Sequence, residues 1–143
     1  MTYNVIVVGG SFAGLSAALQ LARARRRVLV LDSGEPRNRF AQFSHGLFGH
    51  DGQAPSALLE EARSQLLSYD TVSFTEGLAT HAAKAGEGFS VTVGGTVHTA
   101  SRLILATGVR DELSPIPGMQ ERWGISVLHC FYCHGYEVAG RQL

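Results

Sequence analysis

The sequence predicts an α/β fold, a doubly wound parallel sheet that carries an inserted three-stranded antiparallel meander. The run Val5–Val8 is β-branched throughout, which is typical of a strand buried on both faces of a parallel sheet. Such runs alternate with segments in which apolar residues recur at helical spacing, as between Leu58 and Leu67. Glycine turns separate several short strands between residues 78 and 99, a pattern that indicates antiparallel hairpins.

The expected elements follow from these patterns in chain order. They begin with a strand at Val5–Val8, a helix from about Phe12 to Arg25, a strand at Arg27–Asp32, a helix from Pro55 to Tyr69 and a strand at Val72–Thr75. They continue with the meander strands Leu78–Lys84, Phe89–Val93 and Thr96–Thr99, and then with a fourth buried strand at Leu103–Ala106. We expect the meander to form an accessory layer on a Rossmann-like parallel sheet.

Composition limits the classes of function. The chain has 143 residues, of which 45% are hydrophobic and 17% are charged, so one packed domain is expected. The formal net charge is zero, which gives no indication of binding to nucleic acid or to an anionic membrane. No apolar run reaches the roughly 18 residues that span a bilayer, and no leader pattern is evident at the N-terminus. The expected location is therefore cytoplasmic.

A glycine turn after the first strand indicates a nucleotide site. Gly9 and Gly14 occupy the first and third glycine positions of a Gly-x-Gly-x-x-Gly fingerprint, and Ser11 takes the middle one. A helix that starts there points its free N–H groups at a pyrophosphate, and Asp32 follows about 20 residues later, where a carboxylate binds ribose hydroxyls. A generic βαβ unit without nucleotide is the alternative. The candidate binding residues here are Gly9, Gly10, Ser11, Phe12, Ala13, Gly14 and Asp32.

Two further stretches are candidates for cofactor contacts. The turn-rich loop that begins at Ser33 carries Arg37 and Arg39, which could pair with a phosphate or stack on adenine, or could be ordinary surface residues. The loop continues past His45 with aromatic residues and glycines, which favours a loop that faces a ligand. Its histidine spacing fits no recognised metal site. Small residues at Ala106, Thr107 and Gly108 would permit a second close approach to a ligand.

The cysteines point to redox chemistry. Cys130 and Cys133 are the only two in the chain, and two residues separate them in the segment His129–Glu137. Such a pair can close a small disulfide and transfer two electrons. Three other interpretations remain open. The pattern Cys-x-x-Cys-His is the attachment signature of c-type haem, which needs an exported chain. The two thiols and a histidine could hold zinc, or the cysteines could be inert and buried.

Taken together, these motifs resemble the low-molecular-weight thioredoxin reductase family of flavoproteins. The matching pieces are Val7–Gly14, the strand that ends at Asp32, Leu105–Gly108, Ile116–Gly118 and the Cys130-x-x-Cys133 pair. The resemblance implies that residues 1–110 are the N-terminal part of an incomplete FAD-binding domain. It implies a linker at 111–124 and the start of an NAD(P)H-binding domain at 125–143. Because that domain would be largely absent, the chain is expected to be a fragment that is not competent alone.

The resemblance also implies roles. FAD would lie over the glycine turn, Cys133 would be nearer the flavin, and Cys130 would exchange with the substrate disulfide. Electrons would pass from NADPH through FAD and the thiol pair to a thioredoxin-like protein or a small disulfide, in a protein that forms a homodimer. His134 stands where the family usually carries an aspartate that donates a proton, and imidazole can perform the same task.

Two rival functions remain open at this point. Some members with Cys-x-x-Cys-His are oxidases that close dithiols in small molecules and pass electrons to oxygen, and His134 makes this chain similar to them. The other rival is a nucleotide-binding redox sensor that uses the same thiols as a switch without catalysis.

Overall fold

The computed structural model describes residues 2–128 and 130–142. The chain divides into two compact units. The first unit combines the residues up to Pro36 with Leu59–Gly108, and the second combines Arg37–Leu58 with the residues from Val109 onward. Each unit is built from two separate stretches of sequence.

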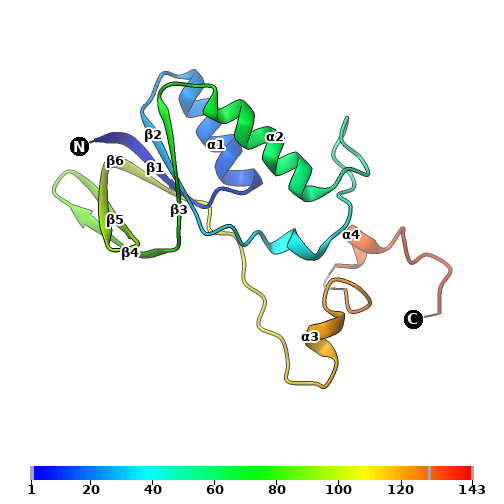
Figure 1. Ribbon diagram of the computed structural model, residues 1–143. Coiled ribbons are helices and arrows are strands. Elements are labelled where there is room, and N and C mark those ends of the chain that lie inside the picture. Colours follow the sequence, from blue (N-terminus) through cyan, green and yellow to red (C-terminus); the bar gives the residue numbers. More distant parts are fainter. Residues whose placement is uncertain (1, 129, 143) are drawn as a thin grey trace. The chain divides into compact units, whose positions relative to one another are not determined.

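The first unit is built on one six-stranded sheet (Figure 1). Its strands are β1 (Tyr3–Val8), β2 (Val28–Asp32), β3 (Val72–Glu76), β4 (Ala79–Ala85), β5 (Gly88–Val93) and β6 (Thr96–Leu105). They lie in the order β3-β2-β1-β6-β5-β4. Strands β3, β2, β1 and β6 are parallel, whereas β5 pairs antiparallel with both β6 and β4. The predicted α/β class, with its parallel sheet and antiparallel meander, is confirmed.

The end of the meander differs from the sequence prediction. The strands expected separately at Thr96–Thr99 and Leu103–Ala106 form one continuous strand, β6. The intervening residues, Ala100 to Arg102, include no glycine or proline that would end a strand. The expectation that Leu103–Ala106 is fully buried is also wrong, since Leu105 is 68% exposed. Beyond Ala100, β6 pairs with β1 alone, so this part of the strand is an open edge.

Two helices were expected to pack against the sheet, and both are present. α1 spans Phe12–Arg23 and α2 spans Pro55–Leu67. α1 ends two residues before the expected Arg25, because Arg25 has a φ of 59° and cannot continue a right-handed helix. α2 likewise ends two residues before Tyr69.

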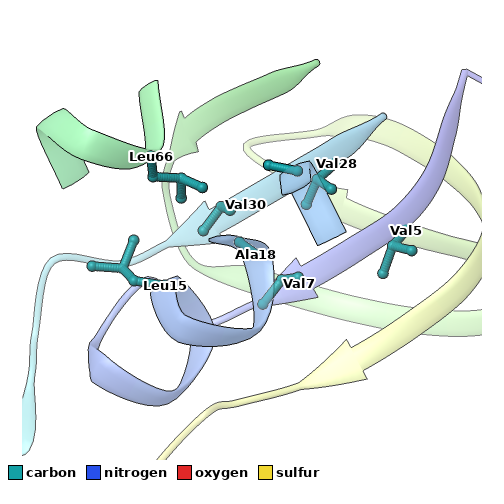
Figure 2. Packing of buried hydrophobic residues seen from close by; sticks show 8 residues of the cluster. Val5, Val7, Leu15, Ala18, Val28, Val30 and Leu66 are labelled. Atoms are coloured by element: carbon teal, nitrogen blue, oxygen red, sulfur yellow. The ribbon is translucent and has the colours of Figure 1, made fainter. Parts of the chain in front are cut away.

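Successive side chains along each strand point to opposite faces of the parallel sheet, so the core consists of two clusters, one on each face. One cluster consists of Val5, Val7, Leu15, Ala18, Ala22, Val28, Val30 and Leu66, most of which Figure 2 labels. It packs α1 and α2 against β1 and β2. The other cluster consists of Ile6, Leu29, Leu31, Val91, Val93 and Ala100. It joins the opposite face of β1 and β2 to the meander, which therefore covers that face.

Leu66 offers a test of the helix-side core. It is 1% exposed, whereas its neighbour Leu67 on the same helix is 48% exposed. We expect Leu66→Ala to lower the free energy of unfolding by about 2–5 kcal/mol, because it leaves a cavity in the cluster. The control Leu67→Ala should change it by less than about 1 kcal/mol. Urea unfolding followed by circular dichroism measures both, and equal effects would contradict the assignment of Leu66 to the core.

The second unit has little regular structure. It holds the short 3₁₀ helix η1 (Arg37–Phe40) and the single-turn helices α3 (Met119–Arg122) and α4 (Phe131–His134). Isolated bridges join Ser44 to Gln53 and Trp123 to Val127. Across residues 2–128 and 130–142, no helix has both the length and the apolar character needed to cross a membrane.

Candidate functional site

The glycine turn after β1 is closed so tightly that side chains would not fit. A Cβ at Gly9 would overlap the carbonyl oxygen of Ala106, and Gly9 has a φ of 109°. A Cβ at Gly14 would overlap the carbonyl oxygen of Gly9, which brings the first turn of α1 against the end of β1. A Cβ at Gly10 would lie 2.6 Å from the Cβ of Asp32. All three glycines are therefore required by contacts within the first unit.

The start of α1 presents polar backbone groups at this turn. Ser11 is the N-cap residue in an extended conformation, and its side chain makes no capping hydrogen bond. Phe12 and Ala13 follow as exposed residues of the first helical turn. The first N–H groups of a helix have no partners within the helix and carry a partial positive charge. This turn therefore has the chemical character of an anion site.

Asp32 is fixed at the same turn. Its Oδ1 accepts a hydrogen bond of 3.1 Å from the N–H of Gly10. Ser33 follows at the end of β2 and is exposed. Ala106 donates its N–H to the carbonyl of Val8 at 2.8 Å, and the exposed residues Thr107 and Gly108 continue from it. The candidates of the first unit thus gather at the carboxyl ends of β1, β2 and β6, the edge at which α/β proteins bind ligands.

In the second unit, the two cysteines form a hydrogen-bonded pair at α4. Both are free thiols, with Cys130 half-buried and Cys133 exposed. Cys130 caps α4, and its Sγ accepts the N–H of Cys133 at 3.1 Å. A bond from the Cys133 side chain, reinforced by this N–H, lowers the pKa of Cys130. The same thiol–thiol bond, together with burial, raises the pKa of Cys133. The pair is therefore asymmetric, with Cys130 the better thiolate.

A cavity of about 380 Å³ lies beside the thiol pair within the second unit. Aromatic side chains, among them Phe40, Phe43 and Trp123, form part of its wall. The polar part of the lining includes Arg37, His45, Cys133 and His134. Four of the candidates from the sequence are thus brought together at one cavity. Arg39 is not part of this lining and instead stacks 4.3 Å above the ring of Phe40.

Ion pairs hold the histidine and the arginine of this cavity. Arg37 makes a bidentate pair with Asp111, with distances of 2.8 Å and 2.5 Å. His45 lies 3.5 Å from Asp51 through Nδ1 and 3.5 Å from Glu137 through Nε2. The N–H of Gly46 and the ring of His45 lower the pKa of Asp51. These three acidic partners were not identified from the sequence. Asp111 lies 74 residues from Arg37, so no local pattern could signal the pairing.

Among residues 2–128 and 130–142, no group of three or more histidine, cysteine and acidic side chains could hold a metal ion. His129, which belongs to the cysteine segment, lies outside the described residues.

The asymmetry of the thiols predicts a difference in reactivity with pH. The thiolate is the reacting species, so Cys130 should retain reactivity at pH values where Cys133 is already protonated. In the reduced protein at pH 7, we expect iodoacetamide to alkylate Cys130 at least about threefold faster than Cys133, since one pKa unit changes the thiolate fraction about tenfold. Peptide mass spectrometry after timed quenching measures both rates. Faster labelling of Cys133 would contradict the assignment.

The fold and the cysteine pair together define a class of protein. Residues 3–139 match the family described as pyridine nucleotide-disulphide oxidoreductase, and the chain belongs to that family. Within it, the relatives are thioredoxin reductase-like, as the sequence motifs indicated.

Individual relatives support this placement. The thioredoxin reductase tcpT of Claviceps purpurea is 41% identical over 141 residues, which cover 96% of this chain and 44% of that protein. The thioredoxin reductase of Treponema pallidum is 35% identical, covering 93% of this chain and 44% of its own. The crystal structure of an oxidoreductase from Agrobacterium tumefaciens has a TM-score of 0.92 and 54% identity, with 97% of this chain and 48% of that chain covered. The chain thus spans less than half the length of these relatives.

Proposed function

We propose that this chain is the flavin-binding and dithiol-bearing part of a disulfide reductase that uses NADPH. In this proposal, electrons pass from NADPH through FAD and the Cys130–Cys133 pair to a disulfide in a thioredoxin-like protein or a small molecule. Residues 1–110 belong to the FAD-binding domain, 111–124 form the linker, and 125–143 begin the NAD(P)H-binding domain. The whole protein is proposed to be a cytoplasmic homodimer that binds neither nucleic acid nor membrane.

The observation that carries this proposal is the hydrogen-bonded thiol pair. Cys133 donates its N–H to the Sγ of Cys130 at 3.1 Å, and His134 follows directly at the wall of the same cavity. A thiolate at one cysteine and a thiol three residues later are what disulfide exchange requires. An imidazole beside them can donate and accept protons near neutral pH.

The glycine turn of the first unit fits a dinucleotide. Backbone atoms fill the space of the missing side chains at Gly9 and Gly14, the side chains of Asp32 and Phe74 fill it at Gly10, and the start of α1 is exposed. Ser11 to Ala13 would hold the pyrophosphate of FAD, and Asp32 would hold the ribose through its second carboxylate oxygen. Ser33, Ala106, Thr107 and Gly108 would border the bound cofactor. When bound, FAD supplies the exchange of an electron pair between NADPH and a disulfide.

The residues of this chain account for the exchange step. The Cys130 thiolate attacks the substrate disulfide, so that one Cys130–substrate bond forms while the first substrate sulfur leaves as a thiolate. Cys133 then loses its proton to His134 and attacks Cys130, which closes the Cys130–Cys133 disulfide and releases the second substrate sulfur. The imidazolium of His134 returns the proton to a leaving thiolate. One substrate thiol, one substrate thiolate and one enzyme disulfide result, and the thiolate takes its proton from solvent, so the electron pair moves from enzyme to substrate.

The cavity favours a second candidate function. A volume of about 380 Å³ with aromatic walls beside Cys133 is the size of a small-molecule site. The same thiol chemistry running in reverse would close a dithiol in such a molecule, with oxygen as the final electron acceptor. This second candidate is a dithiol oxidase, and His134 serves equally well as its acid and base.

Anaerobic stopped-flow on the full-length protein separates these functions. Rapid loss of flavin absorbance on mixing with NADPH supports the reductase. Absence of that reaction, together with bleaching by small dithiols, would overturn the reductase in favour of the oxidase. Purification of the full-length protein without a yellow cofactor would contradict both and leave a redox sensor.

A further inference from the structure

Arg37 has a fixed position at the dithiol cavity. Its Nε and Nη2 bind the two carboxylate oxygens of Asp111 at 2.8 Å and 2.5 Å. The side chain of Arg37 is 41% exposed and that of Asp111 is 21% exposed. A bidentate pair fixes the guanidinium plane as well as its distance, which a single contact would not do. Asp111 also raises the pKa of Arg37, so the arginine remains charged throughout the range in which thiols titrate.

Arg37 and Cys133 line the same cavity. Besides the hydrogen bonds from Cys133, which are the larger cause, the charge of Arg37 lowers the pKa of Cys130. On Cys133, whose pKa is raised by its bond with Cys130 and by burial, the charge of Arg37 acts in the lowering direction. The other ionisable groups at the cavity are His45, Tyr132 and His134, with Glu137 and Asp51 facing His45. Of these groups, Arg37 alone carries a positive charge that does not depend on pH near neutrality.

We propose that Arg37, held by Asp111, is a positioning residue that stabilises the thiolate form of the Cys130–Cys133 pair. From the sequence, Arg37 is a candidate for pairing with a cofactor phosphate, but its bidentate partner and its place in the cavity lining associate it with the sulfur pair. The inference rests on the dithiol role in the proposed function. It adds a residue to that chemistry and requires no contact with substrate.

Arg37 acts on the thiol pair electrostatically. A thiolate gains from a nearby positive charge, and the gain shifts the protonation equilibrium towards the reactive form. Arg37 is partly exposed, so solvent and salt screen its effect, and we expect a modest change. A several-fold change in thiolate fraction at pH 7 corresponds to less than one pKa unit.

The test measures thiol reactivity in the reduced, full-length protein with its cofactor bound. Iodoacetamide alkylation of Cys130 is followed by peptide mass spectrometry from pH 5 to 9. Arg37→Gln should slow alkylation at pH 7 by about threefold and move the midpoint of the pH profile upward. Arg37→Lys, which keeps the charge, should restore at least half of the wild-type rate. The control Arg110→Gln removes the same charge at the residue next to Asp111 and should leave the pH profile of Cys130 alkylation unchanged.

An Arg37→Gln profile that coincides with wild type would overturn the inference, as would an equal shift in Arg110→Gln. If Arg37→Gln does not fold, the salt dependence of Cys130 alkylation in the wild-type protein tests the inference instead. Raising the salt concentration from 0.05 M to 1 M should then slow Cys130 alkylation at pH 7, and no change would overturn the inference. Alkylation starts from reduced protein and needs no electron transfer. If NADPH does not reduce the flavin, the alkylation rates can therefore still be measured and interpreted. A failure of the proposed function is thus distinguishable from a failure of the role inferred for Arg37.

Discussion

Cys130→Ser should abolish disulfide reduction by the full-length protein while NADPH still bleaches its flavin. A serine hydroxyl does not ionise near neutral pH, so the attack on the substrate disulfide is lost. We expect turnover with a disulfide substrate to fall by at least about a thousandfold, as when other nucleophiles are removed. Steady-state assays with NADPH give the turnover, and anaerobic stopped-flow gives the rate of bleaching.

Cys133→Ser should block the second step of the exchange, in which the Cys130–Cys133 disulfide closes. Turnover should fall by a similar factor, because no second thiol can close the disulfide, and electron passage between flavin and thiols should be blocked. Tyr136→Phe serves as a control for substitution near α4, since Tyr136 is 90% exposed and lies outside the cavity lining. Turnover that survives either cysteine change would refute the dithiol role.

Gly9→Ala should release FAD and destabilise the first unit. The new methyl group would overlap the carbonyl of Ala106, and both backbone segments directly follow Val8 and Leu105, which the β1–β6 register pairs. We expect a loss of about 1–3 kcal/mol in unfolding free energy from overpacking, and loss of most bound flavin. Absorbance of the purified full-length protein measures flavin content, and thermal unfolding measures stability.

A second glycine provides the matched control for Gly9. Gly95 also has a positive φ, 81°, but a Cβ there would meet no atom within 4 Å. Gly95→Ala therefore carries the backbone strain alone and should retain the flavin. If Gly9→Ala and Gly95→Ala behave alike, the close contact with Ala106 does not determine cofactor binding.

The fold was predictable from sequence because its signals are local. The β-branched run of β1, the helical spacing of α2 and the glycine turns of the meander each specify an element by short-range patterns. The strand β6 shows the limit of such patterns. Nothing in the sequence separates its meander half from its parallel half, because the change of partner occurs within an uninterrupted strand. Pairing partners are set by the rest of the sheet and leave no local signal.

The parts of the candidate site that belong to a sequence motif were predictable. The parts that depend on a partner residue far away in the chain were not. The glycine turn and the cysteine pair have fixed spacings with a physical cause, so the sequence identified them. The pairing of Arg37 with Asp111 and of His45 with Glu137 joins residues far apart in the chain. Only folding of the second unit brings them together. The use of Asp32 as an acceptor for Gly10 was likewise visible only in three dimensions.

Reduction by NADPH should convert the Cys130–Cys133 disulfide into two thiols, and counting these thiols tests the dithiol role. The oxidised full-length protein is mixed anaerobically with NADPH. The thiols that appear are counted with a chromogenic thiol reagent, and mass spectrometry identifies the cysteines that carry them. We expect two new thiols per chain, at Cys130 and Cys133, with equivalent consumption of NADPH. Bleaching of the flavin without any new thiol at these two positions would contradict it.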